Sequence, residues 1–286
     1  MKILTWNVNG LKPVIKNGFF NYIEHEKPDI ICLQETKTNE ESVSKLLEPL
    51  AEYHLECSSS KRDDNFPYSG VAILSRKKPS EVRKDFGSPT FNKEGRILVA
   101  EFPTFVLFNC YFPTGASSEK YQMMKRAFYK ECAGALSRTL ASGKEVILCG
   151  DFNTAREERD VADAYKKKYT HGFLQDDRDD IEMLFSSGFL DAFRIKMAEG
   201  GHYTWWANTE LREKNLGWRI DYFLISQGLR TLIKTCEHYP KVSLSDHCPV
   251  VLELSDDSIV SSRDSSRDKI RKPGQDRFCA EIETLT

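Results

Sequence analysis

The stretch Ser245-Asp246-His247-Cys248-Pro249 places a carboxylate and an imidazole side by side, directly before an apolar run. That run, residues 249–254, is short and rich in Val and Leu, which is typical of a buried β-strand. A proline that follows such a pair fits the first position of a strand. The stretch therefore predicts that Asp246 and His247 lie at the rim of a sheet, outside its core.

Three earlier polar clusters follow the same pattern, because each begins where a short, β-branched-rich apolar run stops. They are Asn7-Val8-Asn9-Gly10 after residues 3–6, Gln34-Glu35-Thr36-Lys37 after residues 30–33, and Gly150-Asp151-Phe152-Asn153 after residues 146–149. One acid at a strand end is commonly a cap or turn residue. Four such clusters, counting Asp246-His247, instead predict one shared polar rim.

Strand-like and helical patterns alternate along the chain. Strands are expected at 2–7, 30–34, 70–75, 97–102, 105–111, 146–151, 220–226 and 249–254, with the fourth and fifth forming a hairpin. Helices are expected after a capping box at Thr38-x-x-Glu41, over residues 118–140, and around Ile181, Leu184 and Phe185 before Gly188. This interleaving predicts mixed sheets with helices packed outside them.

Composition narrows the class of protein without naming it. The 286 residues suit one large domain or two small ones, and 40% hydrophobic content supports a substantial core. A net charge of −2 neither indicates nor excludes a nucleic-acid binder, because the basic footprint can be a local patch. No apolar run reaches the roughly 18 residues of a membrane span, and the strand pattern at the N-terminus does not suggest a signal peptide.

Two further features concern the cysteines and the C-terminal end. None of the eight cysteines forms Cys-x-x-Cys, so we expect neither a structural zinc site nor an oxidising compartment; an intracellular location fits best. Cys32, Cys110 and Cys149 lie inside apolar runs and are interpreted as small core residues. Residues 255–286 are charged and poor in large apolar groups, which predicts a flexible tail.

The motifs together resemble the exonuclease III family of abasic-site endonucleases, in the deoxyribonuclease-I-like superfamily. The shared segments, in the family's order over residues 1 to about 254, are Thr5–Leu11, Pro28–Lys37, Tyr68–Ala72, Glu94–Arg96, Tyr111–Pro113, Cys149–Asn153, Gly217–Phe223 and Ser245–Pro249. The resemblance implies an α/β (α+β) fold, a four-layer α/β/β/α sandwich of two mixed sheets flanked by helices. It also implies one catalytic domain over 1–254.

The activity that the resemblance implies is Mg²⁺-dependent hydrolysis of the phosphodiester 5′ to abasic sites in double-stranded DNA. A 3′→5′ exonuclease or 3′-end-cleaning activity is expected beside it, on DNA with damaged 3′ ends. Mn²⁺ is expected to substitute for Mg²⁺. The expected protein is a monomer without membrane association, in the cytoplasm of a prokaryote or the nucleus of a eukaryote.

Candidate metal ligands follow from the anionic substrate, since hydrolysis of a phosphodiester needs charge neutralisation and an activated water. A hard divalent cation takes oxygen ligands, and Glu35, an acid at a strand end, is the best single candidate. The resemblance makes Glu35 the principal ligand and adds the neighbours, direct or through water, Asn7, Asn9, Asp151, Asn153, Asp246 and His247. Asn9 stands where some members of the family have aspartate.

Candidate catalytic residues are Asp151, Asn153, His247, Asp221 and Tyr111. Asp151 and Asn153 share a face if their strand continues, and a carboxylate there can take a proton from water. The family alternatives for Asp151 are nucleophile activation, protonation of the leaving group, or a second metal. A protonated His247 held by Asp221 would donate to the phosphate, and the family's tyrosine at Tyr111 contacts the scissile phosphate.

For the substrate, the resemblance places Trp205, Trp218 and Ile220 around the abasic sugar, with Arg219 and Thr114 as further contacts. Thr114 stands where the family often has asparagine or glutamine. Threonine is shorter and has no amide NH₂, so that phosphate contact is expected to be missing or water-mediated. The basic residues expected at phosphates are Arg212, Lys214, Lys61-Arg62, Arg76-Lys77-Lys78 and Lys166-Lys167-Lys168.

Two other functions stay open from the sequence. One is another phosphoesterase of the same fold, such as an inositol polyphosphate 5-phosphatase or a sphingomyelinase. The other is a non-catalytic DNA-binding homologue, against which the joint presence of Glu35, Asp151, Asp221, Asp246 and His247 argues.

Overall fold

Two six-stranded sheets form the centre of the molecule, which is represented by a computed structural model describing residues 1–60, 69–115, 118–166 and 170–255. The first sheet has the order β11 (Ile233–His238), β12 (Val250–Leu254), β1 (Lys2–Asn7), β2 (Ile30–Gln34), β4 (Val71–Ser75), β3 (His54–Ser58). The second has the order β5 (Glu81–Arg83), β6 (Ile97–Glu101), β7 (Phe105–Tyr111), β8 (Glu145–Asp151), β10 (Asp221–Ile225), β9 (Leu190–Asp191). Both are mixed, because β1–β2 and β7–β8 pair in parallel and the other neighbours are antiparallel.

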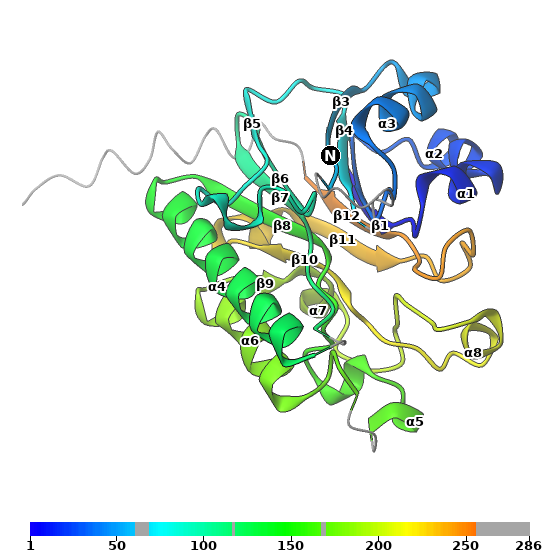
Figure 1. Cartoon of the computed structure of the whole chain (residues 1–286), viewed down its shortest axis with the longest axis vertical. Coiled ribbons are helices and arrows are strands. Elements are labelled where there is room, and N and C mark those ends of the chain that lie inside the picture. The colour runs from blue at the N-terminus through cyan, green and yellow to red at the C-terminus, as the bar shows by residue number, and fades with distance from the viewer. Residues whose placement is uncertain (61–68, 116–117, 167–169, 256–286) are drawn as a thin grey trace, which may run out of the picture.

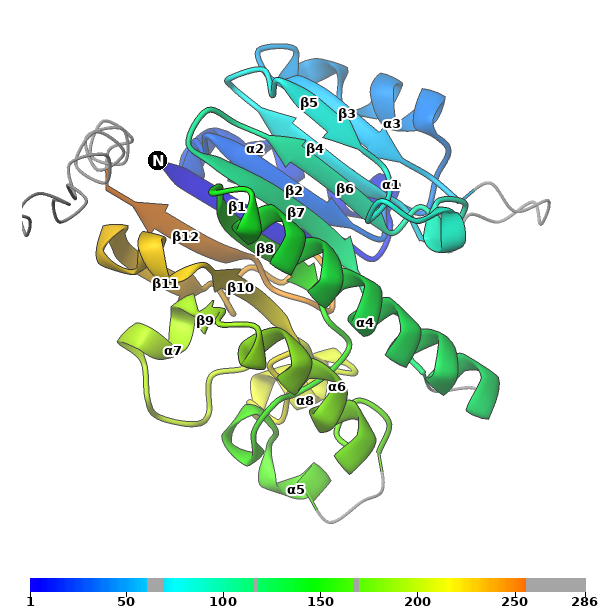
Figure 2. The ribbon, with the colours of Figure 1, turned by 90° about the vertical axis from the view of Figure 1, so that its left-hand side faces the viewer.

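The sheets pack face to face, and helices cover both outer faces (Figure 1). Helices α1 (Leu11–Lys16), α2 (Phe19–Glu26) and α3 (Glu40–Leu46) lie on the first sheet. Helices α4 (Glu119–Ala141) and α6 (Gln175–Ser186) lie on the second, with α4 crossing its strands in Figure 2. The sequence prediction of a four-layer α/β/β/α sandwich is confirmed.

The remaining helices are short and lie in the connections. They are α5 (Asp163–Lys166), α7 (Ala192–Lys196) and α8 (Thr209–Glu213), with the 3-10 turns η1 (Glu48–Leu50), η2 (Pro89–Phe91), η3 (Glu158–Asp160) and η4 (Gln227–Leu232). Helix α5 lies beyond one end of the strands, at the bottom of both views (Figures 1 and 2). Within the described part of the chain, no helix is both long and apolar enough to cross a bilayer.

Three apolar layers hold the sandwich together. Between the sheets, strand residues such as Ile30, Ile73, Leu107 and Phe223 are almost wholly buried. Strands that are buried on both faces have continuous apolar runs, so the core strands could be predicted from the sequence. Buried amides also join the sheets, since Asn109 Nδ2 of β7 donates to the carbonyls of Leu33 and Ala72 at 3.1 and 2.9 Å.

The sequence predicted the eight core strands to within one residue at each end and missed the edges. β3, β5 and β11 carry charged and half-exposed residues, and β9 has only two residues, so none forms a clear apolar run. The hairpin of β6 and β7 and the helix over 118–140 are confirmed. The capping box at Thr38 is wrong: α3 begins at Glu40, and its N-cap is Asn39, whose side chain accepts from Ser42 N at 2.8 Å.

Candidate active site

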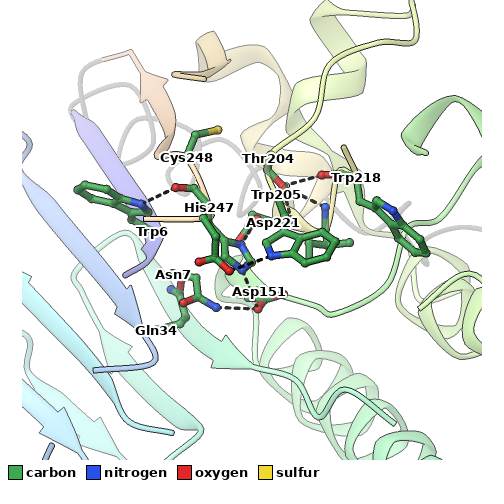
Figure 3. A network of polar contacts seen from close by, with 12 residues as sticks. Trp6, Asn7, Gln34, Asp151, Thr204, Trp205, Trp218, Asp221, His247 and Cys248 are labelled. Carbon is green, nitrogen blue, oxygen red and sulfur yellow. Dashed lines mark hydrogen bonds and ion pairs between the residues drawn. The ribbon is translucent and has the colours of Figure 1, made fainter. Parts of the chain in front are cut away.

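The predicted polar rim exists at one edge of the sandwich, where the ends of strands from both sheets meet (Figure 3). Asn7 closes β1, Tyr111 closes β7 and Asp151 closes β8. Asp221 begins β10, which runs antiparallel to β8 and pairs Asp221 with Asp151. The strand registers therefore gather residues that lie up to about 200 positions apart in the sequence.

At the centre of the rim, ligand atoms of Glu35, Asp151 and His247 all lie within 4.8 Å of one another. Asn7 links the two acids, because its Nδ2 donates to Glu35 Oε1 and to Asp151 Oδ2, both at 2.8 Å. Its Oδ1 is taken by the backbone N–H of Asn9 at 3.0 Å. Asn7 thus orients the carboxylates in this structure rather than presenting an oxygen beside them.

Several side chains of the rim depend on an uncommon backbone conformation. Asn9, Glu35, Lys37 and Asn153 have φ between 45° and 51°, in the left-handed region that non-glycine residues seldom adopt. Main-chain hydrogen bonds hold them there, including Gly10 N to Glu35 O at 2.8 Å and Lys37 N to Ser69 O at 2.9 Å. Such conformations persist only where the surroundings impose them, and they cluster at functional sites.

His247 and Asp221 form a buried pair. His247 Nδ1 lies 2.9 Å from Asp221 Oδ2, and its Nε2 lies 3.9 Å from Asp151 Oδ2. Burial alone would lower the pKa of His247, but Asp221, Asp151 and Asp246 outweigh it and raise the pKa to about 10. The imidazole is therefore a cation at neutral pH, with its Nε2–H directed into the rim.

Burial shifts the pKa of Asp151 in the direction opposite to its effect on the pKa of His247. Burial, with the charges of Asp221 and Glu35, raises the pKa of Asp151 to about 7 against the opposing effect of His247. Asp151 Oδ1 accepts the backbone N–H of Asn153 at 2.8 Å. A carboxyl group that titrates near neutral pH is suited to exchanging a proton with water.

Asn153 reaches the rim through a turn and not along the strand. β8 ends at Asp151, so strand alternation does not place the two residues on one face. The left-handed conformation of Asn153 instead turns its side chain back to Asp151. Its Nδ2 donates to Phe112 O at 2.9 Å. Its carbonyl accepts from Lys125 Nζ of α4 at 2.9 Å, and Lys125, wholly buried, pairs with Asp177 at 2.6 Å.

The outer side of the rim carries Asn9, Lys37 and Asp246. Asn9 Nδ2 donates to Asp246 Oδ1 at 3.0 Å, and Lys37 Nζ lies 2.7 Å from Glu35 Oε2 while also donating to Asn9 Oδ1. Burial would raise the pKa of Asp246, but His247 and hydrogen bonds from Trp205, Asn9 and Ser245 lower it. Asp246 is therefore an anion at neutral pH.

The rim has the chemistry that a divalent cation requires. Four carboxylates (Glu35, Asp151, Asp221 and Asp246) face two cationic groups, Lys37 and His247, so two negative charges are uncompensated when all four are ionised. The donors are hard oxygens, which Mg²⁺ prefers. Of the residues predicted as ligands, Glu35 and Asp151 are placed to offer oxygens, and His247 presents an N–H group. The Nδ2 of Asn153 donates to Phe112 O and Asp151 Oδ2.

An aromatic wall adjoins this cluster. Trp205 and Trp218 meet edge to face with ring centroids 6.4 Å apart, and Trp205 lies 6.4 Å from the ring of His247. Trp205 Nε1 donates to Asp246 Oδ2 at 3.1 Å, which fixes the half-buried indole beside the acids. Ile220 and Trp218 belong to one apolar cluster, so the predicted sugar-contacting residues do lie together.

Tyr111 is also at the rim, since it is buried with its hydroxyl near Glu35. Burial and the Glu35 charge raise the pKa of Tyr111 well above its usual value, so it is a neutral hydrogen-bonding group. Thr114 follows in a loop and is exposed.

Arg219 is the principal correction to the predicted site. Its side chain is 1% exposed, and its guanidinium binds Asp160 at 2.8 Å and Asp191 at 2.7 Å inside the protein. Three hydrogen bonds to these two carboxylates occupy the guanidinium, so Arg219 does not face a substrate phosphate. It is a packing residue behind Ile220.

Other basic residues are also placed away from the rim or occupied. Arg212 donates to the carbonyls of Pro240, Val242 and Ser245, and Lys214 pairs with Glu210 of α8 at 2.6 Å. The Arg76-Lys77-Lys78 run follows β4 beside Asp29, at the opposite end of the sheet from Glu35. The side chains of the Lys61-Arg62 and Lys166-Lys167-Lys168 runs lie outside the described residues.

Sequence reasoning missed three residues that support the site: Lys37, Lys125 and Thr204. Thr204 Oγ1 accepts the backbone N–H groups of Ile220 and Asp221, both at 3.1 Å, and so fixes the start of β10 (Figure 3). Lys37 belongs to the motif Gln34-Glu35-Thr36-Lys37, and its place in that motif could have identified it as a site residue. Lys125 carried a weaker signal, a lysine on the apolar face of the predicted helix 118–140, and Thr204 carried none.

Comparison with known proteins places this geometry in a family. The model of the Endonuclease/Exonuclease/phosphatase family matches residues 4–247. The exodeoxyribonuclease of Bacillus subtilis is 35% identical over 89% of this chain and 100% of its own length. Among solved structures, an AP endonuclease from Archaeoglobus fulgidus matches with a TM-score of 0.80 and 28% identity, over 90% of this chain and 100% of that one.

A further solved structure is that of the 3′ phosphatase NExo from Neisseria bound to a product DNA hairpin, with a TM-score of 0.80 and 27% identity over 90% of this chain and 100% of that one. The chain belongs to the Endonuclease/Exonuclease/phosphatase family and, within it, to the exonuclease III family that its motifs resemble. It is accordingly a phosphodiester hydrolase of the exodeoxyribonuclease and AP endonuclease type.

Proposed function

We propose that the protein is a Mg²⁺-dependent DNA repair endonuclease that hydrolyses the phosphodiester 5′ to abasic sites in double-stranded DNA. A 3′→5′ exonuclease or 3′-end-cleaning activity accompanies it at the same site. The observation that carries the proposal is the contact between two unlike surfaces: the cluster of Glu35, Asp151 and His247 lies against the wall of Trp205 and Trp218.

The residues of the cluster divide the chemistry. Bound Mg²⁺ would supply charge neutralisation for the phosphate, held by Glu35 with Asn9 and Asp246 as neighbours. Asp151, with a pKa raised to about 7, accepts the proton of the attacking water, and Asn153 orients that carboxylate. His247 Nε2–H, held by Asp221, and the Tyr111 hydroxyl donate to the phosphoryl oxygens as negative charge develops.

The apolar wall accounts for a preference for a missing base. Trp205 offers half-buried ring surface beside the acids, and Trp218 and Ile220 pack with it, which suits a deoxyribose turned out of the helix. A sugar without a base enters such a pocket without the cost of unpairing and accommodating a base. The same surfaces admit a frayed 3′ end, which supports the accompanying exonuclease activity.

The wider expectations follow from the same proposal. The substrate is double-stranded DNA with abasic sites or damaged 3′ ends, Mn²⁺ substitutes for Mg²⁺, and the protein acts as an intracellular monomer. Residues 1–254 form the catalytic domain. The tail predicted over 255–286 lies, from residue 256 on, outside the described residues.

The deciding experiment is incision of a labelled duplex with one tetrahydrofuran abasic analogue, with Mg²⁺ or with EDTA, beside an undamaged duplex. We expect Mg²⁺-dependent cutting 5′ to the analogue, because the analogue resists lyase chemistry and requires hydrolysis. Phosphate release from an inositol polyphosphate without DNA cutting would move the protein to the phosphatase branch of the fold. Binding without any hydrolysis would show a non-catalytic homologue.

A single substitution tests the metal assignment. Glu35→Gln keeps the size of the side chain and removes its charge, so incision should fall by a factor on the order of 10³ or more while duplex binding persists. Glu41→Gln, on an exposed face of α3, is the matched control and should cut normally. Full activity in Glu35→Gln would contradict the placement of the cation at this cluster.

A further inference from the structure

A cavity of about 720 Å³ lies outside the nuclease site, between α7, the edge strand β11 and the segment that carries α8. Its volume is within the range of sites that hold small molecules. Nothing in the proposed hydrolysis uses it.

One wall of the cavity is aromatic. Phe193, Tyr203 and Trp206 line it, and the ring of His238 stacks on Phe193 with centroids 3.9 Å apart and an angle of 13°. Both ring nitrogens of His238 are shielded from solvent and have no hydrogen-bond partner among the described residues. Burial and the nearby charges of Arg219 and Arg194 lower the pKa of His238, so the neutral ring offers one donor and one acceptor.

The other lining groups are predominantly cationic. Lys196, Lys234 and Lys241 come from three different segments, and within the described ranges none of them pairs with a carboxylate. Arg212 adds a fixed charge, because its guanidinium stacks over Trp206 at 4.5 Å and binds only backbone carbonyls. Glu237 is the one acid in the lining, so the cavity is positively charged overall.

We propose that this cavity binds a nucleoside monophosphate, with the base against the aromatic wall and the phosphate at Lys196 and Lys234. A planar heterocycle suits ring surfaces, and it reaches the donor and acceptor of His238 once the imidazole ring turns, since both nitrogens are shielded in this structure. A phosphate suits a group of lysines that lack their own counter-charge, since lysine binds phosphate as a point charge. The ligand is thus chosen by two unlike surfaces that face one cavity.

The site is separate from the nuclease cluster but shares a segment with it. Along residues 203–206, Tyr203 and Trp206 line the cavity, whereas Thr204 holds Asp221 and Trp205 holds Asp246. The two outer residues of this stretch therefore face the cavity, and the two inner ones contact the acids of the nuclease site. The proposal does not depend on which phosphodiester the nuclease cuts.

The test is calorimetric titration of the full-length protein with dAMP in EDTA, beside deoxyadenosine and inorganic phosphate as the two halves of the ligand. We expect dAMP to bind more tightly than either half, and to bind still when a tetrahydrofuran duplex saturates the nuclease site. His238→Phe preserves the stacked ring and removes its nitrogens, and Lys196→Gln with Lys234→Gln removes the charge. Each variant should weaken dAMP binding about tenfold, while incision of the duplex stays at the wild-type rate.

Lys16→Gln with Lys130→Gln, two exposed lysines on other elements, is the matched control and should bind dAMP normally. Thermal unfolding checks that each variant folds, and the lysine pair alone decides if His238→Phe does not. Absence of dAMP binding at millimolar concentration would overturn the proposal, as would binding that the duplex displaces and neither variant changes. Those outcomes concern the cavity only, because incision by the wild-type protein is measured separately.

Discussion

Arg219 and Asp221 lie two residues apart on one buried segment, and the structure uses their charges in opposite ways. Arg219 is surrounded: Asp160 and Asp191 bind its guanidinium, and the ring of Tyr222 lies 4.3 Å from it. Within the described ranges, the Asp221 carboxylate forms an ion pair with His247 alone. The Nε2 atom of His247 lies 3.9 Å from Asp151 Oδ2, too far for a hydrogen bond. We call Arg219 with Asp160 and Asp191 the closed cluster, because its charges are paired with one another inside the protein. We call Asp221, His247 and Asp151 the open cluster, because His247 directs its Nε2 into the rim. The first is expected to stabilise the fold and the second to act on a substrate.

The largest effect expected from this difference is on stability, at the closed cluster. Arg219→Met leaves Asp160 and Asp191 buried beside Arg194 without their main partner, and breaking a buried pair costs about 3–5 kcal/mol. Urea unfolding should show the midpoint falling with an unchanged slope. The folded fraction should retain its turnover, since Arg219 does not reach the rim. A variant that is stable but inactive would return Arg219 to the substrate site.

His247→Gln should have the next largest effect, and it should appear in the rate. Glutamine keeps a polar side chain but removes the imidazolium, and loss of such a donor costs about 10²–10³ in rate. Single-turnover incision measures it, with the unfolding midpoint as the check on folding. His25→Gln, a histidine with its side chain 82% exposed, serves as the control and should cut at the wild-type rate. A loss of less than tenfold would exclude His247 as the donor.

A smaller effect is expected on acid stability at the closed cluster. Burial would raise the pKa of Asp160, but Arg219 and Arg194 lower it to about 2, below its unfolded value. A depressed carboxyl pKa stabilises the fold above the unfolded pKa, and that stabilisation is lost as the pH falls from about 4 to 2. The loss is about 2 kcal/mol. Unfolding measured against pH should show it, and Asp160→Asn, already destabilised, should have a flatter profile in this window.

The contrast between Arg219 and Asp221 also shows which parts of the site can be predicted from the sequence. The rim was predictable because its residues follow buried apolar runs, and parallel strands bring such ends to one edge of a sheet. The sequence pattern alone therefore predicts that Glu35, Asp151 and His247 are neighbours. Trp205 and Trp218 were grouped through family resemblance, and the structure brings them together.

Arg219 could not be assigned in the same way, because its partners lie 59 and 28 positions away and neither carries a motif. A cation in a substrate-binding motif suggests a phosphate contact until the pairing carboxylates are known. The edge strands β3, β5 and β11 escaped prediction for a related reason: half-exposed strands mix charged and apolar residues, and only their neighbours define them.

The finest test of the open cluster separates its charge from its shape. Asp221→Asn keeps the hydrogen-bonding geometry at His247 but removes the charge that most raises the imidazole pKa from its usual value to about 10. Burial is then opposed only by the charges of Asp151 and Asp246, so the pKa of His247 should fall below 10. Because the protonated ring is the donor, activity should be lost as the pH rises through the lowered pKa.

In the wild-type protein, the alkaline decline should not begin until the pH approaches 10. Incision by Asp221→Asn should therefore be nearest to wild type at pH 6 and fall about tenfold for each further pH unit above the new pKa. Rates measured from pH 6 to 9 in saturating Mg²⁺ provide the comparison. A parallel, pH-independent loss would mean that Asp221 positions the ring without setting its charge, and the open cluster would then differ from the closed one in geometry alone.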